Sequence, residues 1–150
     1  MSVGSAGMGV VDKYTPGQLA RVLGLPEPTA EQAAVIGAGL GPLAVIAGAG
    51  SGKSETRAAR LVWLVANGMV RADRVLGLTF TRKAAAELAD RVRNRLDRLY
   101  RAGLADVQAG AEAEPVISTY HAYAGRLVSD HALREGLEPS MRLILSLIHI

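Results

Sequence analysis

The chain has 150 residues, of which 49% are hydrophobic and 21% charged, a composition typical of one ordinary globular domain. It contains no cysteine, which excludes disulfides and thiolate zinc sites and fits a cytoplasmic protein. The net charge of +3 is a mild indication of polyanion binding, although a solvated arginine-rich surface is the commoner explanation.

The N-terminal region begins with residues 1–13, which carry no secretory signal and whose Gly and Ser content predicts a mobile tail. Thr15-Pro16 then predicts a helix start, with threonine as N-cap and proline at the first helical position, and Gly24 can end that helix. Thr29 predicts the start of a second helix, with Gln32 as its capping-box partner. Two short helices therefore precede the first predicted strand.

The most informative segment is a glycine-rich turn between a predicted strand, residues 43–47, and a predicted helix, residues 53–67. The turn consists of Ala47, Gly48, Ala49, Gly50, Ser51, Gly52, Lys53 and Ser54. Glycines let such a turn direct backbone N–H groups at phosphates, and the helix N-terminus adds partial positive charge. The turn therefore predicts a triphosphate site, in which Lys53 reaches the β- and γ-phosphates and the Ser54 hydroxyl binds Mg²⁺.

The uncharged stretch 32–52, which ends in this turn, raises the question of a membrane span. Its glycines and Pro42 argue against one, as does the phosphate-binding pattern itself. We therefore expect no membrane partner and a cytoplasmic location.

Two further strand–helix units follow in the sequence. Residues 75–80 predict a second strand, and Thr81 is the expected N-cap of a long helix over residues 82–101. Residues 116–119 predict a third strand, followed by a helix over residues 121–135. Strands that alternate with helices indicate an α/β fold with a parallel sheet.

The helix over residues 82–101 carries two stripes of side chains. The buried stripe is predicted to consist of Leu88, Val92, Leu96 and Leu99. Arg91, Arg95 and Arg98 form a neighbouring stripe that is spaced to follow a phosphate backbone. A solvated face paired with the helix's own acids is the better interpretation for the more distant arginines.

Aromatic and polar residues follow the second and third predicted strands. The first cluster is Phe80, Thr81, Arg82 and Lys83, and the second is Thr119, Tyr120 and His121. Ligands of open α/β sheets bind at the carboxyl ends of the strands, and aromatic rings beside cations suit the stacking of single-stranded bases. Taken alone, either aromatic is better explained as a cap on the core, and His121 as a hydrogen-bonding group at a helix start.

Gln32 has two interpretations. Its amide presents a donor and an acceptor together, which match the N6/N7 edge of adenine. Its other role is the capping-box partner of Thr29, which the sequence alone favours.

Four ordered motifs together resemble one protein family over residues 14–140. They are Thr29-x-x-Gln32, the turn 47–54, Leu78-Thr-Phe-Thr-Arg-Lys-Ala-Ala-Ala-Glu-Leu88 and Ser118-Thr-Tyr-His-Ala-Tyr123. Their order and spacing are similar to the Q motif, motif I, motif Ia and motif Ib of the UvrD/Rep-like superfamily-one DNA helicases. Residues 14–24 and 76–83 look most like the actinobacterial helicase–nuclease subunits of the AdnB kind.

This resemblance implies the N-terminal part of an ATP-binding domain with a RecA-like P-loop NTPase fold, incomplete in this chain. It implies that Gln32 recognises adenine and that residues 47–54 bind ATP and Mg²⁺, with Lys53 and Ser54 as catalytic groups. The residues implied to contact single-stranded DNA are Phe80, Thr81, Arg82, Thr119, Tyr120 and His121. The implied activity is ATP-driven translocation on single-stranded DNA and 3′ to 5′ unwinding of duplex DNA in repair or recombination. A further candidate partner is a second helicase–nuclease subunit.

The chain departs from the family's pattern in three respects. Many relatives have arginine where this chain has Glu55, so one possible nucleotide contact is missing. No Asp-Glu pair follows an apolar strand, so the acids of motif II are missing, as are the second motor domain and its arginine finger. Residues 141–150 do not resemble the family's continuation and are interpreted as a truncated or foreign tail.

Two other functions stay open at this point. A small P-loop phosphotransferase would need an arginine-rich lid and a carboxylate for the acceptor, and the sequence offers no clear lid. A non-catalytic module would hold ATP or single-stranded DNA without turnover. For this chain on its own, we expect ATP binding without helicase-like hydrolysis.

Overall fold

The computed structural model describes residues 13–50, 52–105 and 114–136. The predicted tail 1–13, apart from Lys13, and the predicted tail 141–150 lie outside the described residues, as does Ser51. The elements in chain order are helices α1 (Pro16–Val22), α2 (Ala30–Ile36) and α3 (Lys53–Ala66), the 3₁₀ helix η1 (Ala72–Arg74), strand β1 (Leu76–Thr79), helix α4 (Arg82–Arg101), strand β2 (Val116–Thr119), helix α5 (Tyr120–His131) and the 3₁₀ helix η3 (Ala132–Glu135).

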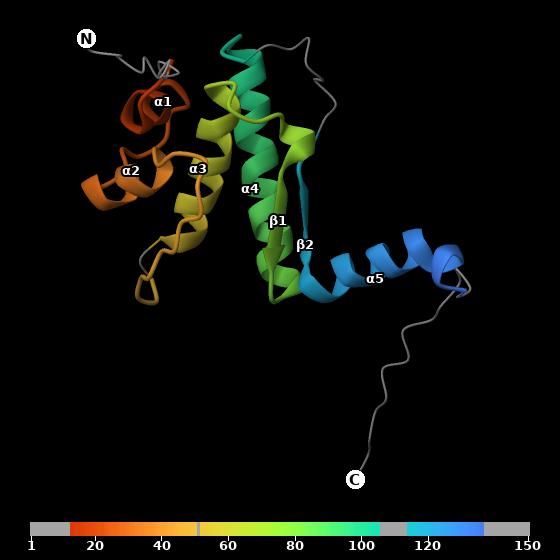
Figure 1. The fold of residues 1–150 in the computed structure, drawn as a ribbon. Helices are drawn as coiled ribbons and strands as arrows, with labels where there is room; N and C mark the ends of the chain where they lie inside the picture. The colour runs from red at the N-terminus through yellow and green to blue at the C-terminus, as the bar shows by residue number, and fades with distance from the viewer. Residues whose placement is uncertain (1–12, 51, 106–113, 137–150) are drawn as a thin grey trace, which may run out of the picture.

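Helices α3 and α4 form the centre of the molecule, with α1 and α2 on one side and the strands on the other (Figure 1). Strands β1 and β2 pair in parallel, with Leu76 opposite Val116 and Thr79 opposite Thr119. Helix α4 connects the two strands and packs against both. The predicted parallel α/β arrangement is therefore confirmed for these two strands, while a complete P-loop fold stays a prediction.

Threonine N-caps start four of the five described α-helices. The side-chain oxygens of Thr15, Thr29, Thr81 and Thr119 each accept a hydrogen bond from a backbone N–H in the first turn. Three of these caps were predicted, at Thr15, Thr29 and Thr81. At α1 the cap is a full capping box with Gln18, a pairing that was not predicted.

The hydrophobic core lies mainly between α3 and α4. Trp63, Val62, Val92 and Leu99 are its largest fully buried side chains. The stripe predicted on α4 is confirmed, because Leu88, Val92, Leu96 and Leu99 are all buried. Each large side chain buried there contributes roughly 1.5–3 kcal/mol relative to exposure. This core fixes the relative positions of the two helices.

Polar contacts attach the start of the described chain to the far end of α3. The Asn67 side chain accepts a hydrogen bond from the backbone N–H of Tyr14 at 2.9 Å and donates one to its carbonyl at 3.3 Å. The indole Nε1 of Trp63 donates to the same carbonyl at 2.8 Å. Asn67 is buried, so these bonds satisfy polar groups that are shielded from water.

The strand predicted for residues 43–47 is wrong for the described structure. The segment runs to the glycine-rich turn without strand pairing, because β1 and β2 pair only with each other. Its apolar side chains are exposed, Ile46 completely and Leu43 and Val45 by about half. An apolar run becomes a strand only where a neighbouring strand satisfies its backbone N–H and C=O groups.

The remaining predicted boundaries differ from the structure by small amounts. Strand β1 is one residue shorter at each end than predicted, and the last predicted helix is divided into α5 and η3. Gly136 ends η3 with a φ of +69°, as expected for a glycine at a helix end. Among the described residues, no helix combines the length and the apolar character needed to cross a membrane.

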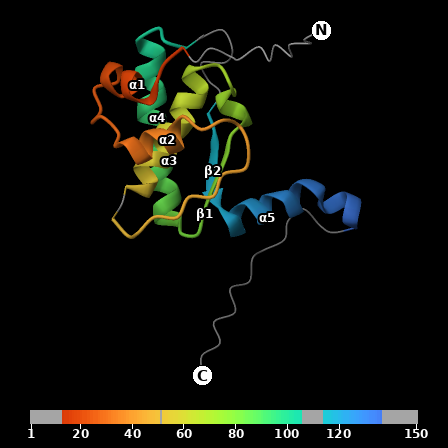
Figure 2. The ribbon, with the colours of Figure 1, turned by 60° about the vertical axis from the view of Figure 1, so that its left-hand side comes forward.

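Helix α5 projects away from the rest of the molecule (Figure 2). None of its own residues is buried, and Leu127 and Val128 are about 40% exposed. Among the described elements, it packs mainly against β2 and η3. It therefore adds little to the core that holds α3 and α4 together.

Candidate functional site

The glycine-rich turn adopts a backbone that only glycine accommodates easily. Gly50 and Gly52 have φ values of +76° and +75°, in the left-handed region where a Cβ would be strained. Directly after Gly52, helix α3 begins at Lys53. The ammonium group of Lys53 donates a hydrogen bond to the carbonyl of Ala47 at 2.9 Å. The lysine thus bridges the two sides of the turn.

Helix α3 differs from the other four described α-helices at its N-terminus. Its N-cap is Gly52, which offers no side-chain hydrogen bond to the first turn. The first N–H groups of a helix have no partner within the helix itself. In α1, α2, α4 and α5 a threonine supplies one, whereas at α3 these donors and the positive end of the helix dipole face the turn.

The structure supports the capping role of Gln32 and also brings its side chain to the turn. Its Oε1 accepts from the N–H of Thr29 at 3.0 Å, which completes the predicted capping box. Its Nε2 lies against Gly52, since a Cβ built on that glycine would be 3.0 Å away. The two interpretations of Gln32 are therefore compatible.

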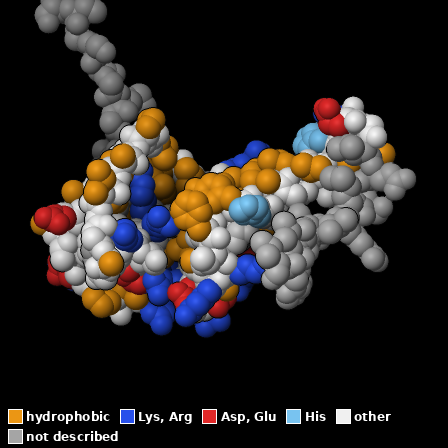
Figure 3. Space-filling view, turned by 90° about the horizontal axis from the view of Figure 1, so that it is seen from below, with side chains coloured by type: hydrophobic (Ala, Val, Ile, Leu, Met, Phe, Trp, Pro, Cys, Tyr) orange, Lys and Arg blue, Asp and Glu red, His pale blue; other side chains and the backbone are white. Residues whose placement is uncertain are grey.

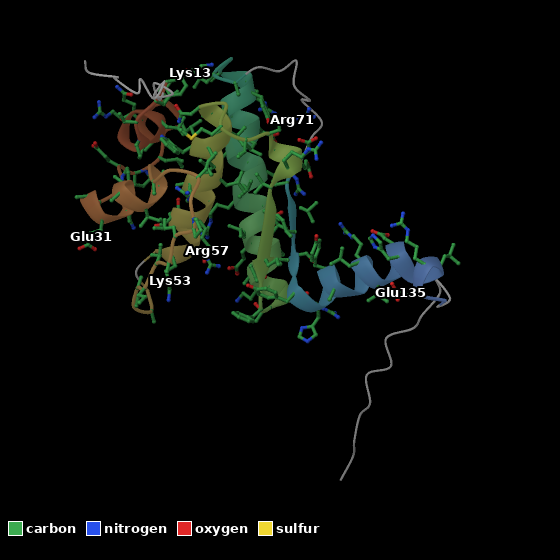
Figure 4. The ribbon with its side chains drawn as sticks, in the orientation of Figure 1. Lys13, Glu31, Lys53, Arg57, Arg71 and Glu135 are labelled. Atoms are coloured by element: carbon green, nitrogen blue, oxygen red, sulfur yellow. The ribbon has the colours of Figure 1, made fainter. Side chains whose placement is uncertain are left out.

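A cavity of about 630 Å³ lies next to the turn. Gln32, Ala47 and Lys53 line it together with Arg57 and Arg60. Lys53 and Arg57 extend from the same end of α3, one helical turn apart (Figure 4). The volume falls within the range of roughly 300–1,000 Å³ that is common for small-molecule sites. The cavity walls are cationic on α3 and apolar at Val35, Leu43 and Val45.

Arg60 holds α2 and the segment after it in place, a role that was not predicted. Its guanidinium donates hydrogen bonds of 2.8–3.1 Å to the carbonyls of Val35, Ile36, Ala38 and Gly39. These carbonyls lie at or just after the C-terminus of α2, where a helix leaves its last acceptors unpaired. Arg60 therefore attaches the helix that carries Gln32 to the helix that carries Lys53.

The two predicted aromatic clusters bring their rings together at the ends of β1 and β2. The ring centroids of Phe80 and Tyr120 are 5.1 Å apart, and the planes are tilted by 34°. Phe80 is 88% exposed and Tyr120 48% exposed. This exposure excludes the interpretation of Phe80 as a cap on the core. Phe80 and Tyr120 thus form an exposed aromatic pair at the ends of β1 and β2.

The polar members of the two clusters are neighbours of these rings in the sequence. Thr81 and Thr119 serve as the N-caps of α4 and α5, while Arg82 and His121 are exposed. The face of the molecule seen in Figure 3 has hydrophobic side chains in its middle, with Lys and Arg side chains to their left and below them and a histidine to their right. Hydrophobic and cationic side chains therefore lie on one face.

The stripe of arginines predicted to follow a phosphate backbone does not form such a surface. Arg95 is buried and forms an ion pair with Glu55 of α3, and Arg91 pairs with the same carboxylate at 3.4 Å. Arg98 donates to the carbonyl of Leu23 at 3.2 Å. Pairing with the helix's own acids is also wrong for these three. The reason is that α4 packs against α3, which brings Glu55 to Arg91 and Arg95, while Arg98 reaches the segment after α1.

The N-termini of α3, α4 and α5 all lie at the same end of the molecule (Figures 1 and 2). The glycine-rich turn precedes α3, and the two aromatic clusters precede or begin α4 and α5. The structure thus brings both sets of predicted residues to one end, at the carboxyl ends of the parallel strands. This is the edge at which open α/β sheets bind ligands.

These features define a mixed α/β domain with a glycine-rich turn at an uncapped helix start and an exposed aromatic pair at adjacent strand ends. The family model described as the UvrD/REP helicase N-terminal domain matches residues 28–147. The chain belongs to this family.

Several curated relatives are similar to the chain. An ATP-dependent helicase/nuclease subunit of Pelotomaculum thermopropionicum is 36% identical over 121 residues, which cover 77% of the chain and 10% of the relative. A "DNA helicase II" of Haemophilus influenzae is 33% identical over 73% of the chain and 14% of the relative. An "ATP-dependent DNA helicase UvrD2" of Mycobacterium tuberculosis is 44% identical over 57% of the chain and 11% of the relative. The chain therefore spans about a tenth to a seventh of the length of these relatives.

Proposed function

We propose that the chain is the N-terminal part of the ATP-binding domain of a DNA helicase and that residues 47–54 bind Mg-ATP. The observation that carries this proposal is the start of α3, where Gly52 leaves the first-turn N–H groups without a side-chain partner. Backbone donors at a helix start, a positive dipole end and a lysine are the groups that bind a triphosphate. The relatives named as ATP-dependent helicases support the same assignment.

In this proposal Lys53 moves from the Ala47 carbonyl to the β- and γ-phosphates. The bond to Ala47 is solvent-exposed and costs little to exchange for a charge-assisted bond to phosphate. Ser54, in the first turn of α3, offers its hydroxyl to Mg²⁺, and Gln32, whose Nε2 lies against Gly52, meets the adenine edge. Bound Mg²⁺ supplies charge neutralisation between the phosphates.

The same proposal assigns single-stranded DNA to the Phe80–Tyr120 pair. Exposed aromatic rings accept stacked bases of any sequence, and Arg82, two residues after Phe80 in the chain, meets the phosphate backbone. In the whole protein, ATP turnover drives translocation along the strand and unwinding of the duplex. The chain alone binds ATP but does not turn it over at a helicase-like rate, because an arginine finger alone contributes about 10³–10⁵ in rate.

The test is to measure Mg-ATP binding by calorimetry and phosphate release by a coupled assay for the 150-residue chain and its Lys53→Ala variant. We expect the parent to bind Mg-ATP without helicase-like turnover, and we expect Lys53→Ala to weaken binding strongly because the phosphates lose their mobile cation. Arg101→Met, which removes an exposed cation from the last turn of α4, is the matched control. Equal ATP affinity in the parent and in Lys53→Ala would show that the turn is not the phosphate site.

A further inference from the structure

The start of α3 contains a carboxylate that works against anion binding. Glu55 lies in the first turn of α3, two residues after Lys53. Its side chain is about half exposed. A negative charge so near a phosphate site repels the ligand, since like charges in a partly desolvated setting interact by several kcal/mol at short range. The effect of Glu55 on an anionic ligand therefore depends on what neutralises it.

Two arginines from α4 contact this carboxylate. Arg91 Nη1 is 3.4 Å from Glu55 Oε2, and Arg95 Nη2 donates to Oε1. With two positive charges and one negative, the three side chains together are net positive. Because α4 presents both guanidinium groups to α3, the carboxylate is neutralised from the side of α4.

Burying Arg95 carries a cost that this ion pair does not fully offset. Its side chain is 7% exposed, and Nη1 is buried without a hydrogen-bond partner among the described residues. Burial, together with the nearby charge of Arg98, lowers the pKa of Arg95. A buried charge with an unsatisfied donor lowers stability relative to an apolar side chain of similar size. Its presence is therefore better explained by an electrostatic role than by fold stability.

The position of the three charges relative to the proposed nucleotide site supports such a role. Glu55 and Arg95 line a cavity of about 250 Å³ together with Gln32 and Thr56. Gln32 and Thr56 also line the larger cavity beside Lys53. The ion pair and the lysine are therefore separated by residues that contact both spaces.

We propose that Arg95, assisted by Arg91, is a positioning residue for the nucleotide site: it holds Glu55 against α4 and cancels its charge, which keeps the start of α3 positive for phosphates. This inference rests on the proposed function, because it presumes that the turn 47–54 binds a nucleotide. It adds that affinity depends on the balance between Glu55 and the α4 arginines, and that this dependence grows with the number of ligand phosphates.

The experiment compares Arg95→Met, Glu55→Gln, the double variant and the Arg101→Met control in binding ATP, ADP and AMP to the 150-residue chain. We expect Arg95→Met to weaken ATP binding roughly tenfold, ADP less and AMP least, because Glu55 is then left with Arg91 alone. Glu55→Gln should have the opposite sign and strengthen ATP binding. The double variant should return to within about threefold of the parent, since both opposing charges are removed together.

The opposite signs separate this role from a purely structural one. A structural ion pair would make both single variants bind worse, equally for all three nucleotides and in proportion to lost stability, which circular dichroism melting measures. If Arg95→Met does not fold, Glu55→Gln decides alone: unchanged or weakened ATP binding overturns the proposal. If the folded parent binds no nucleotide, the proposed function itself is wrong, and that result is distinct from equal affinities in parent and variants.

Discussion

Replacing Phe80 with alanine should separate nucleic-acid binding from folding. The ring is 88% exposed, so its removal takes little apolar area out of the folded core. Its ring packs beside that of Tyr120, with the centroids 5.1 Å apart, and such pairs are worth about 0.5–1.5 kcal/mol beyond area burial. We therefore expect the free energy of unfolding to fall by no more than about 1 kcal/mol, near the low end of that range because the pair is exposed.

Binding to single-stranded DNA should fall by much more. A base stacked on an aromatic ring contributes roughly 1–3 kcal/mol, which corresponds to about 5- to 150-fold in affinity. The loss should be similar for oligothymidine and oligoadenosine, because every base has a π-face. Tyr120→Ala should show a smaller loss, since about half of that residue is already covered.

The assay is a fluorescence anisotropy titration of labelled oligonucleotides at several salt concentrations, with urea unfolding measured in parallel. Leu99→Ala provides the contrasting control, because this fully buried residue should cost about 2–5 kcal/mol of stability and act on DNA only through unfolding. If Phe80→Ala binds both oligonucleotides like the parent, the aromatic pair is not a binding surface, and the reasoning from its exposure is refuted.

Three further predictions concern the turn, the C-terminal end of α3 and the C-terminal end of α4. Gly52→Ala should destabilise the chain more than Gly50→Ala. Both glycines have φ near +75°, but only the Cβ at position 52 would meet the Gln32 amide, at 3.0 Å. Thermal melting compares the two variants, and equal losses of stability would contradict the contact with Gln32. Asn67→Ala should lower the free energy of unfolding in urea by about 1–3 kcal/mol, because the Tyr14 N–H and the Trp63 carbonyl lose their hydrogen bonds to the side chain. A change below about 0.5 kcal/mol would be inconsistent with these hydrogen bonds. Burial raises the pKa of Tyr100 above 10.0. The contribution of Tyr100 to the free energy of unfolding should therefore be complete below pH 10.0 and be lost as the pH rises through the raised pKa. Tyr100→Phe should remove this loss of stability at alkaline pH, which urea unfolding at several pH values measures.

The elements that were predictable from the sequence are those set by neighbours in the chain. Thr29 and Gln32 form their capping box within three residues, and the spacing of Leu88, Val92 and Leu96 alone determines the buried face of α4. The parallel strands also followed, because each is a short apolar run bounded by a turn and a helix cap. In each of these cases, residues within a few positions of one another were sufficient to predict the element.

The features that were missed depend on partners distant in the sequence. Glu55 and Arg95 are 40 residues apart, and no local pattern indicates that they pair. Arg60 resembles any charged residue on a helix until the C-terminus of α2 is placed beside it. Residues 43–47 have a strand's composition, yet strand formation requires a neighbour that the described structure does not supply. The role of each of these residues depends on which distant segment of the chain packs beside it.

The projection of α5 has a consequence for hydrogen exchange and for the entropy of binding. We expect the hydrogen-bonded amides in the buried middle of α3 and α4 to exchange only when the core opens, whereas those of α5, which has no buried residue, should exchange through local opening at little cost. Tyr120 is the first residue of α5, while Phe80 directly precedes the N-cap of the well-packed α4. The two rings of the aromatic pair thus belong to segments of unequal rigidity. A ligand that contacts both rings should order the α5 side on binding, and increased protection of the α5 amides should be the first sign that it has bound.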